Sequence, residues 1–121
     1  MDIDYMVEAG FVLPNGTEYP DDWDCTSSDF EEAAGTYLAL DLSNKRALLD
    51  NEGNVNEGEV LYKRLVAQKY DDEGLLADTA VIIYEDENML YAPRLTTPTD
   101  IVEALARFGY KNLDDFLERV F

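Results

Sequence analysis

The stretch that decides the fold is Ala80-Val81-Ile82-Ile83-Tyr84, the most β-branched apolar run of the 121-residue chain. It is followed by the polar residues Glu85-Asp86-Glu87-Asn88 and by the shorter apolar run Met89-Leu90-Tyr91-Ala92. β-Branched and aromatic residues favour strands, and the polar residues between the two runs favour a turn. The pattern predicts a core strand that enters a hairpin loop. Because a lone hairpin is only marginally stable in water, we expect other segments to pack on it.

The N-terminal segment contains a strong turn signal. Pro14-Asn15-Gly16 separates Phe11–Leu13 from Thr17–Tyr19, and Asn-Gly favours the positive φ angles of a tight turn. The sequence therefore predicts a turn between two short extended pieces. Residues Asp2–Val12 fit either a short strand or a first helical turn, and the pattern leaves both open.

The middle of the chain gives a second predicted hairpin and one ambiguous segment. In Thr36–Leu42 the leucines alternate with smaller or polar residues, which predicts a half-buried strand. Ser43–Lys45 would then turn the chain into Arg46–Asp50. Residues 57–70 gather large apolar side chains on one side of a helical wheel, so we favour a helix there. A strand over Val60–Ala67 stays open as the alternative.

Helix caps predict a short helix near the start and two helices at the end of the chain. Ser27 or Ser28 is the expected N-cap of a helix over Asp29–Ala34, which Gly35 would end. Thr97 or Thr99 caps a helix over Asp100–Phe108, and Asn112 begins the last helix. The apolar face of the first C-terminal helix is predicted to contain Ile101, Val102, Leu105 and Phe108.

The expected fold class is therefore α+β: a small, mainly antiparallel sheet of hairpins packed by a C-terminal helical pair. The length fits a single domain, residues 1–121. With 46% hydrophobic residues and eight Tyr, the chain lacks the low hydrophobicity of disordered acidic segments. No apolar run approaches the roughly 20 residues of a membrane span, and the acidic start lacks the basic region of a signal peptide. We expect a cytoplasmic protein in which Cys25, the only cysteine, forms no internal disulfide.

The charge is large and unevenly distributed. The formal net charge is −18, and residues 1–44 contain eleven carboxylates without a single Lys or Arg. Such an excess repels nucleic acid and anionic membranes, so we expect neither as a direct partner. It also destabilises the compact state through self-repulsion. A basic partner, solubility or adaptation to salt would each account for it.

Several kinds of chemistry are excluded or disfavoured by the residues themselves. The chain has no His, which removes histidine bases and imidazole metal sites, and one Cys does not build a thiolate zinc site. No glycine spacing matches a phosphate-binding loop, and no acidic cluster has the order of a calcium loop. With 27 Asp and Glu residues, a catalytic carboxylate pair is not identifiable. We expect a protein that is not an enzyme and holds neither a cofactor nor a metal.

The composition favours a binding function. In charge and length the chain resembles anti-restriction and anti-CRISPR proteins of phages and mobile elements, and immunity proteins that neutralise basic nucleases. This resemblance implies a DNA-mimic inhibitor whose carboxylates occupy the basic nucleic-acid-binding surface of a protein such as a nuclease. The alternatives are a small regulatory protein–protein interaction module whose acidity serves solubility, and salt adaptation. The sequence does not decide the oligomeric state.

The candidate partner-binding residues form three acidic clusters. The first surrounds the only tryptophan, where an aromatic anchor and steering charges would act together, although Trp23 also fits a core position. The other two lie in predicted turns. The full set is Asp21, Asp22, Trp23, Asp24, Asp29, Glu31, Glu32, Asp71, Asp72, Glu73, Glu85, Asp86 and Glu87.

Overall fold

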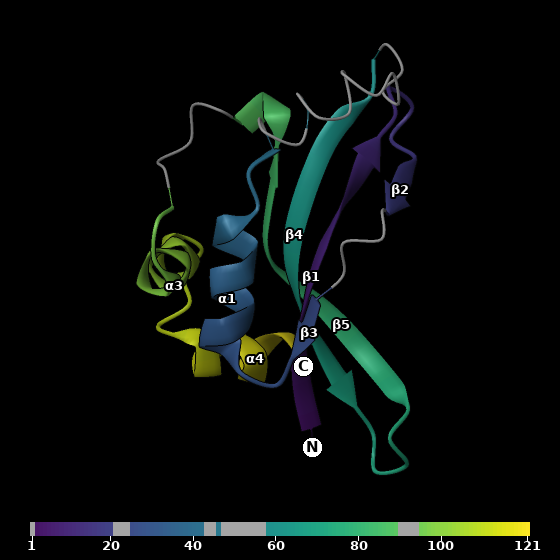
Figure 1. Ribbon diagram of the computed structural model, residues 1–121. Helices are drawn as coiled ribbons and strands as arrows, with labels where there is room; N and C mark the ends of the chain where they lie inside the picture. Colours follow the sequence, from purple (N-terminus) through teal and green to yellow (C-terminus); the bar gives the residue numbers. More distant parts are fainter. Residues whose placement is uncertain (1, 21–24, 43–45, 47–57, 90–94) are drawn as a thin grey trace.

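The computed structural model describes residues 2–20, 25–42, 46, 58–89 and 95–121, and it has the α+β architecture that the sequence predicts (Figure 1). The strands are β1 (Asp2–Val12), β2 (Glu18–Pro20), β3 (Cys25–Ser27), β4 (Val60–Tyr70) and β5 (Leu76–Asp86). The helices are α1 (Phe30–Ala39), α3 (Pro98–Arg107) and α4 (Leu113–Val120), with a single 3-10 turn η1 (Glu87–Met89).

The described strands form one antiparallel sheet with the order β2-β1-β4-β5. The short strands β2 and β3 pair with different parts of β1, near its end and its middle. The helices lie on one face of this sheet, with α1 between the sheet and α3 (Figure 1). The C-terminal helices therefore reach the sheet partly through α1.

The N-terminal hairpin is confirmed. Residues Asp2–Val12 are the strand β1 rather than a helical turn. The N–H of Leu13 donates to the carbonyl of Thr17, and Gly16 has the positive φ of 87° that the Asn-Gly pair predicts. This turn brings β2 back along the end of β1.

The helix that we favoured over residues 57–70 is wrong for residues 60–70, which form β4. This strand lies between β1 and β5, and its pairing with β1 runs without interruption from Asp2↔Tyr70 to Val12↔Val60. Leu61–Lys63 and Leu65–Ala67 are all buried, so both faces of β4 are covered. A strand buried on both faces has apolar residues in near-continuous runs, and such runs also satisfy a helical wheel.

The hairpin predicted over residues 36–50 is wrong where the structure describes it, because Thr36–Ala39 belong to α1. Residues 43–45 and 47–50 lie outside the described residues. Ala33, Ala34 and Tyr37 have helical spacing and are fully buried against the sheet. Their packing outweighs the strand-like alternation of the leucines that follow.

The short helix expected over Asp29–Ala34 is confirmed at its start and extends further than predicted. Asp29 itself, rather than Ser27 or Ser28, is the N-cap: its Oδ1 accepts the N–H of Glu31 at 3.1 Å. Gly35 lies inside α1 and does not end it. The helix instead ends at Ala39, with Leu40 as its C-cap.

The core strand predicted at residues 80–84 is confirmed as part of β5. The strand is longer than expected, because Glu85 and Asp86 belong to it rather than to a turn. The turn at residues 71–75 connects β5 to β4, and the two strands pair antiparallel. β5 lies at the edge of the described sheet. Residues 90–92 of the expected partner strand lie outside the described residues, and residue 89 ends η1.

The C-terminal helical pair is confirmed together with its caps. Thr97 and Asp100 form a reciprocal capping box at the start of α3, and Asn112 caps α4. The prediction that Phe108 lies on the buried face of this helix is wrong, because its side chain is 79% exposed. The helix ends at Arg107, and Gly109, with a φ of 92°, turns the chain before another buried position is reached.

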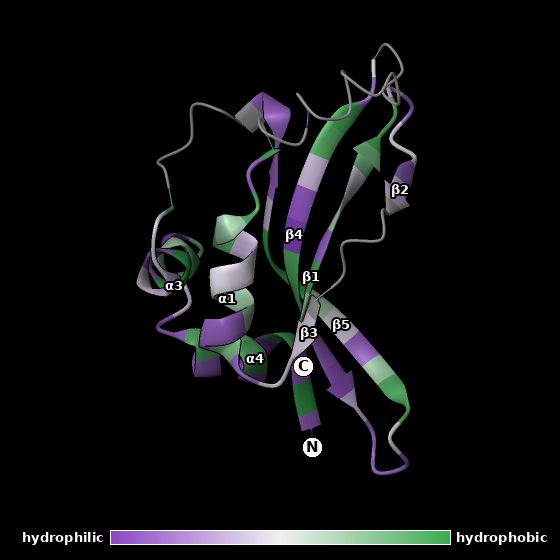
Figure 2. Cartoon of the chain, in the orientation of Figure 1, coloured by the Kyte–Doolittle hydropathy of each residue, from purple (hydrophilic) through white to green (hydrophobic). Residues whose placement is uncertain are grey.

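The hydrophobic core lies between α1, the helix-facing side of the sheet and the C-terminal helices. Figure 2 shows apolar residues recurring along α1 and the neighbouring strands, with hydrophilic residues at the turn between β4 and β5. The buried residues of this cluster are Tyr5, Val7, Ala33, Ala34, Tyr37, Leu65, Ala67, Ile82, Ile101, Leu105 and Phe116.

Candidate functional site

The sequence-predicted site residues do not form one patch among the described residues. Asp21, Asp22, Trp23 and Asp24 lie outside the described residues. Asp71–Glu73 occupy the turn before β5, whereas Glu85–Glu87 lie at its other end. A strand of this length spans about 33 Å, so the two clusters are separated by most of the sheet.

Glu87 holds internal elements together. Its carboxylate forms an ion pair with Arg46 and accepts the backbone N–H of Leu61 at 2.7 Å. Burial acts to raise the pKa of Glu87, but the bonds from Arg46 and Leu61 outweigh it and lower the pKa. Arg46 in turn donates to the carbonyl of Glu59 at 2.7 Å. The carboxylate of Glu87 is thus already engaged within the fold.

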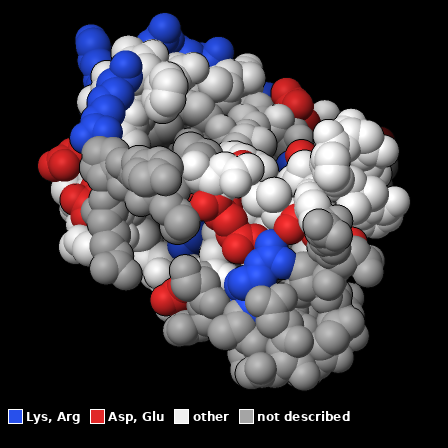
Figure 3. All heavy atoms as spheres, turned by 90° about the horizontal axis from the view of Figure 1, so that it is seen from above, with Lys and Arg blue, Asp and Glu red and all other residues white. Residues whose placement is uncertain are grey.

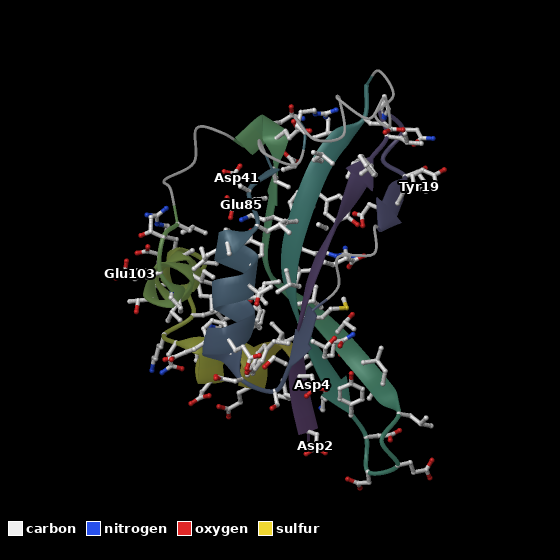
Figure 4. All side chains as sticks on the ribbon, in the orientation of Figure 1. Asp2, Asp4, Tyr19, Asp41, Glu85 and Glu103 are labelled. Atoms are coloured by element: carbon white, nitrogen blue, oxygen red, sulfur yellow. The ribbon has the colours of Figure 1, made fainter. Side chains whose placement is uncertain are left out.

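Glu85 belongs to a polar cluster at the end of α1. Its Oε1 accepts the hydroxyl of Tyr37 at 2.6 Å, and burial together with this bond raises the pKa of Tyr37. The buried Lys63 donates from Nζ to the carbonyls of Tyr37 at 2.8 Å and Leu40 at 2.9 Å. Figure 4 shows Glu85 and Asp41 near each other at this end of the helix. The lysine thereby binds two carbonyls at the C-terminal end of the helix, of which that of Tyr37 also accepts the N–H of Leu40 at 3.3 Å.

The polar cluster around Lys63 contains residue types that also occur in catalytic sites. Here Lys63 and Glu85 are hydrogen-bonded to other groups of the fold. Burial lowers the pKa of Lys63, and the charges of Glu85 and Asp41 oppose that shift in part. Its Nζ also lies 4.2 Å from the centre of the Tyr37 ring. Among the described residues, every buried side-chain nitrogen and oxygen has a hydrogen-bond partner. The sequence analysis missed this cluster because it favoured a helix over residues 57–70, and nothing near Lys63 in the sequence indicates its contacts with α1.

A second polar cluster lies on the sheet face opposite α1. Arg64 pairs with Glu8 at 2.7 Å and with Glu18 at 3.1 Å, linking β4, β1 and β2. The rings of Tyr62 and Tyr84 stack with their centres 5.7 Å apart beside this ion pair. Because Glu8 is only 5% exposed, its pairing with Arg64 compensates a buried charge. This cluster also fastens strands to one another.

Several exposed carboxylates gather where β1, α1 and α4 begin, at one end of the molecule (Figure 1). The rings of Tyr5 in β1 and Phe30 in α1 lie 5.4 Å apart, which brings these starts together. Burial and then the nearby Asp114 carboxylate of α4 raise the pKa of Tyr5. We define this surface, the acidic end, by six residues that are all at least partly exposed: Asp2, Asp4, Asp29, Glu31, Glu32 and Asp114.

The acidic end contains part of the predicted set and residues that the prediction omitted. Asp2 and Asp4 project from alternate positions of β1, about 6.8 Å apart, and Figure 4 shows them at the start of that strand. Asp29, Glu31 and Asp114 lie at helix starts, where the helix dipole favours negative charge. The fold, rather than any motif, brings these carboxylates together.

The basic side chains are less evenly placed than the acidic ones. Arg107, Lys111 and Arg119 surround the turn between α3 and α4, where Arg119 donates to the carbonyl of Gly109 at 2.9 Å. Figure 3 shows Lys and Arg side chains at one corner and again near the middle of this face, beside Asp and Glu side chains. Acidic residues of α4 lie beside these bases, since Arg119 pairs with Asp115 at 3.6 Å.

Within the described residues, no group of three or more Asp, Glu, His or Cys side chains is arranged to hold a metal ion. In the same part of the chain, no helix is long and apolar enough to cross a membrane. The fold and its surface define a small acidic α+β protein. No protein-family model matches the chain, and neither a curated protein nor a solved structure shows significant similarity to it.

Proposed function

We propose that this chain is a non-catalytic inhibitor that binds the basic nucleic-acid-binding surface of another protein, in the manner of a DNA mimic. The observation that carries the proposal is the acidic end, whose six carboxylates, all at least partly exposed, belong to the neighbouring starts of β1, α1 and α4. The net charge of −18 adds a long-range field of the same sign. Lys and Arg residues that bind phosphates would be attracted to such a surface.

The internal polar clusters support a binding role over a catalytic one. Glu8, Glu85 and Glu87 are each occupied by an arginine, a tyrosine or a backbone donor within the fold. Reacting groups of an enzyme need an open position for substrate, whereas these groups hold strands and helix together. The exposed carboxylates remain for a partner. We expect the partner to be a nuclease or another nucleic-acid-binding enzyme.

The first test is capture of the partner and competition by nucleic acid. Immobilised protein is used to isolate binding partners from cells that express it, and the partners are identified. The proposal expects a basic nucleic-acid-binding protein whose association slows as salt rises, because charge steering is screened over about 8 Å at physiological ionic strength. Target that is already loaded with nucleic acid should bind far more slowly. Equal rates for free and loaded target would contradict mimicry.

The second test reverses charges that the fold does not need for caps or buried pairs. Glu31→Lys, Glu32→Lys and Asp114→Lys together should slow association by about tenfold or more, because steering charges act mainly on the on-rate. Asp29 is left unchanged because it caps α1. Glu103→Lys, on the exposed surface of α3 away from the acidic end, is the control (Figure 4). A triple variant that associates like the control would show that the acidic end is not the site.

The alternative is a regulatory interaction module whose acidity serves solubility. The specific observation in its favour is Phe108, an aromatic side chain that is 79% exposed. In that case Phe108→Ser should weaken binding strongly, since exposed aromatic anchors contribute much of the energy of an interface. Charge reversal at the acidic end would then have little effect. The two variants together distinguish the two functions.

A further inference from the structure

The outer edge of β5 is unpaired among the described residues. β5 pairs with β4 on one side and is the last strand of the described sheet. Figure 1 shows the hairpin of β4 and β5 extending past the helical layer at its turn. All residues from Asp71 to Thr79 are exposed. This half of β5 is therefore exposed at the edge of the described sheet, where the Asp78 Oδ1 already accepts the N–H of Thr79 at 2.8 Å.

Exposed apolar side chains accompany this edge. Leu75, Leu76 and Val81 are 61%, 53% and 47% exposed, and they are three of the five exposed large hydrophobic residues in the described part of the chain. Figure 2 shows the apolar end of β5 next to the hydrophilic turn. An apolar strand edge is the feature that binds another strand, because the backbone supplies hydrogen bonds and the side chains supply contact area.

The edge has part of the usual protection against strand pairing, in its two register shifts, and lacks the rest. Residues 71–86 contain no Lys, Arg or Pro, which natural proteins place on edges to prevent association. The register of β5 with β4 shifts at two places, beside Val66 and beside Tyr70. Between these shifts Asp78–Val81 pair regularly with Val66–Lys69. This regular run is therefore available for a further strand.

The charges along the edge select the partner. Six carboxylates lie between residues 71 and 86, with no basic residue among them: Asp71, Asp72, Glu73, Asp78, Glu85 and Asp86. A second copy would bring the same carboxylates and a further net charge of −18 to the contact. A strand that carries Lys or Arg would instead complement it. Charge complementarity thus favours a basic segment of another protein over self-association.

We propose that β5 receives an extended, basic segment of the partner as an additional strand along Leu76–Val81. The basic character of that segment rests on the proposed function, whereas the position of β5 at the edge of the described sheet is a property of the fold. The turn before β5 is already ordered: Asp71 Oδ1 accepts the N–H groups of Glu73 and Leu75, each at 2.9 Å. Gly74 supplies the positive φ of 80° that this turn requires. An ordered edge reduces the entropy cost of adding a strand.

The test uses a short, capped peptide of alternating Val and Lys as a basic strand and measures binding by fluorescence anisotropy. Its matched control is the same peptide methylated on alternate backbone nitrogens, which keeps the charges but removes hydrogen bonds along one edge. We expect the control to bind at least about tenfold more weakly, because strand addition depends on main-chain hydrogen bonds. Amide hydrogen exchange should show new protection within Leu76–Val81 when the unmethylated peptide binds.

Two protein variants check the location. Val81→Lys places a charge in the regular run, whereas Leu75→Lys makes the same charge change in the turn outside it. The proposal expects the first variant to weaken peptide binding more than the second. Circular dichroism is used to check that both variants are folded.

Several results would overturn the proposal. Equal binding of both peptides would mean that only charge attracts them, which leaves the DNA-mimic function standing without the edge. Absence of binding, or protection confined to the acidic end, would also exclude the edge as the site. Light scattering that shows a dimer with protected β5 amides in the absence of peptide would identify a second copy as the occupant.

Discussion

Lys63 binds the C-terminal end of α1, and the residues near Lys63 in the sequence do not reveal this contact. Its Nζ donates to carbonyls of α1 that lie 26 and 23 residues earlier in the chain. The positive charge also lies at the C-terminal end of the helix, where the helix dipole is negative. Nothing in the residues around Lys63 distinguishes it from a solvated lysine. Only the packing of α1 on β4 makes it a buried cap.

Two tyrosines of the sheet predict that the protein loses stability at alkaline pH. Burial, followed by neighbouring carboxylates, raises the pKa of Tyr62 and of Tyr84 to about 12. In the unfolded chain these hydroxyls would ionise near the usual value of about 10. Above that pH the unfolded state loses protons that the folded state keeps, so its population grows. We predict that the free energy of unfolding falls as the pH rises from about 10 to about 12.

The measurement is urea unfolding across this pH range, with tyrosinate absorbance to follow ionisation directly. The double variant Tyr62→Phe and Tyr84→Phe should show a shallower decline, because two of the shifted groups are absent. Tyr19→Phe, on the exposed side chain of β2, is the control and should keep the wild-type slope. A slope that is identical in all three proteins would refute the assignment to these tyrosines.

The elements that sequence reasoning predicted correctly are those determined by neighbouring residues. Asn15-Gly16 predicted the first turn, and Thr97 and Asn112 predicted two helix starts. The β-branched run at residues 80–84 predicted a strand. Each of these signals acts over a few residues, so tertiary packing did not override it.

The errors arose where two periodicities fit the same residues. Thr36–Leu42 alternates like a strand, yet Tyr37 is part of a helical face that α1 buries completely. Residues 60–70 fit a helical wheel, yet both faces of β4 are covered. In each case the deciding contact is made with an element distant in the chain, which a local pattern does not contain.

Two adjacent residues of β5 test where the core ends. Ile82 belongs to the core cluster and is only 8% exposed, whereas Val81 is 47% exposed, because successive side chains of a strand point to opposite faces of the sheet. We predict that Ile82→Ala lowers the free energy of unfolding by about 2 to 4 kcal/mol through lost burial and a cavity. Val81→Ala should cost less than about 1 kcal/mol. Urea denaturation measures both, and equal losses would mean that the edge is packed differently.

Substitution of two glycines tests where α1 and α3 end. Gly35 lies inside α1 with open space around an added methyl group, while Gly109 after α3 has a φ of 92°. We predict that Gly35→Ala raises the free energy of unfolding by about 0.5 to 1 kcal/mol, because alanine loses less backbone entropy in a helix. Gly109→Ala should lower it, because a side chain is strained at positive φ. Thermal unfolding of both variants is the measurement, and destabilisation by Gly35→Ala would place the end of α1 near that residue.

The carboxylates of the described residues divide into those bound within the fold and those exposed to solvent. The prediction that Asp71–Glu73 are exposed in a turn is correct, whereas Glu85 and Glu87 are bound to Tyr37 and Arg46. Sequence reasoning identified acidic clusters but not which carboxylates the fold uses. That distinction depends on donors from other strands and helices. Partner binding by the exposed set remains a proposal.

Salt should stabilise the protein by screening its self-repulsion. Raising NaCl from about 0.01 M to about 0.15 M shortens the screening length from about 30 Å to about 8 Å, and about 1 M reduces it to about 3 Å. With a net charge of −18, we predict that most of the rise in melting temperature occurs below physiological salt. Differential scanning calorimetry over this range measures it. A protein adapted to high salt would instead remain unfolded at low salt and gain stability up to molar concentrations.

The charge-reversed variant Glu31→Lys, Glu32→Lys and Asp114→Lys makes this prediction specific. Three reversals change the net charge by +6, from −18 to −12. Because they remove repulsion at the acidic end, the melting temperature of the variant should depend less on salt than that of the wild type. They also oppose the helix dipoles of α1 and α4, which lowers stability at every salt concentration. The slope against salt, rather than the melting temperature itself, therefore reports the repulsion. An unchanged slope would show that the carboxylates at this end do not repel one another appreciably, and the acidic end would then lack the field that a DNA mimic needs.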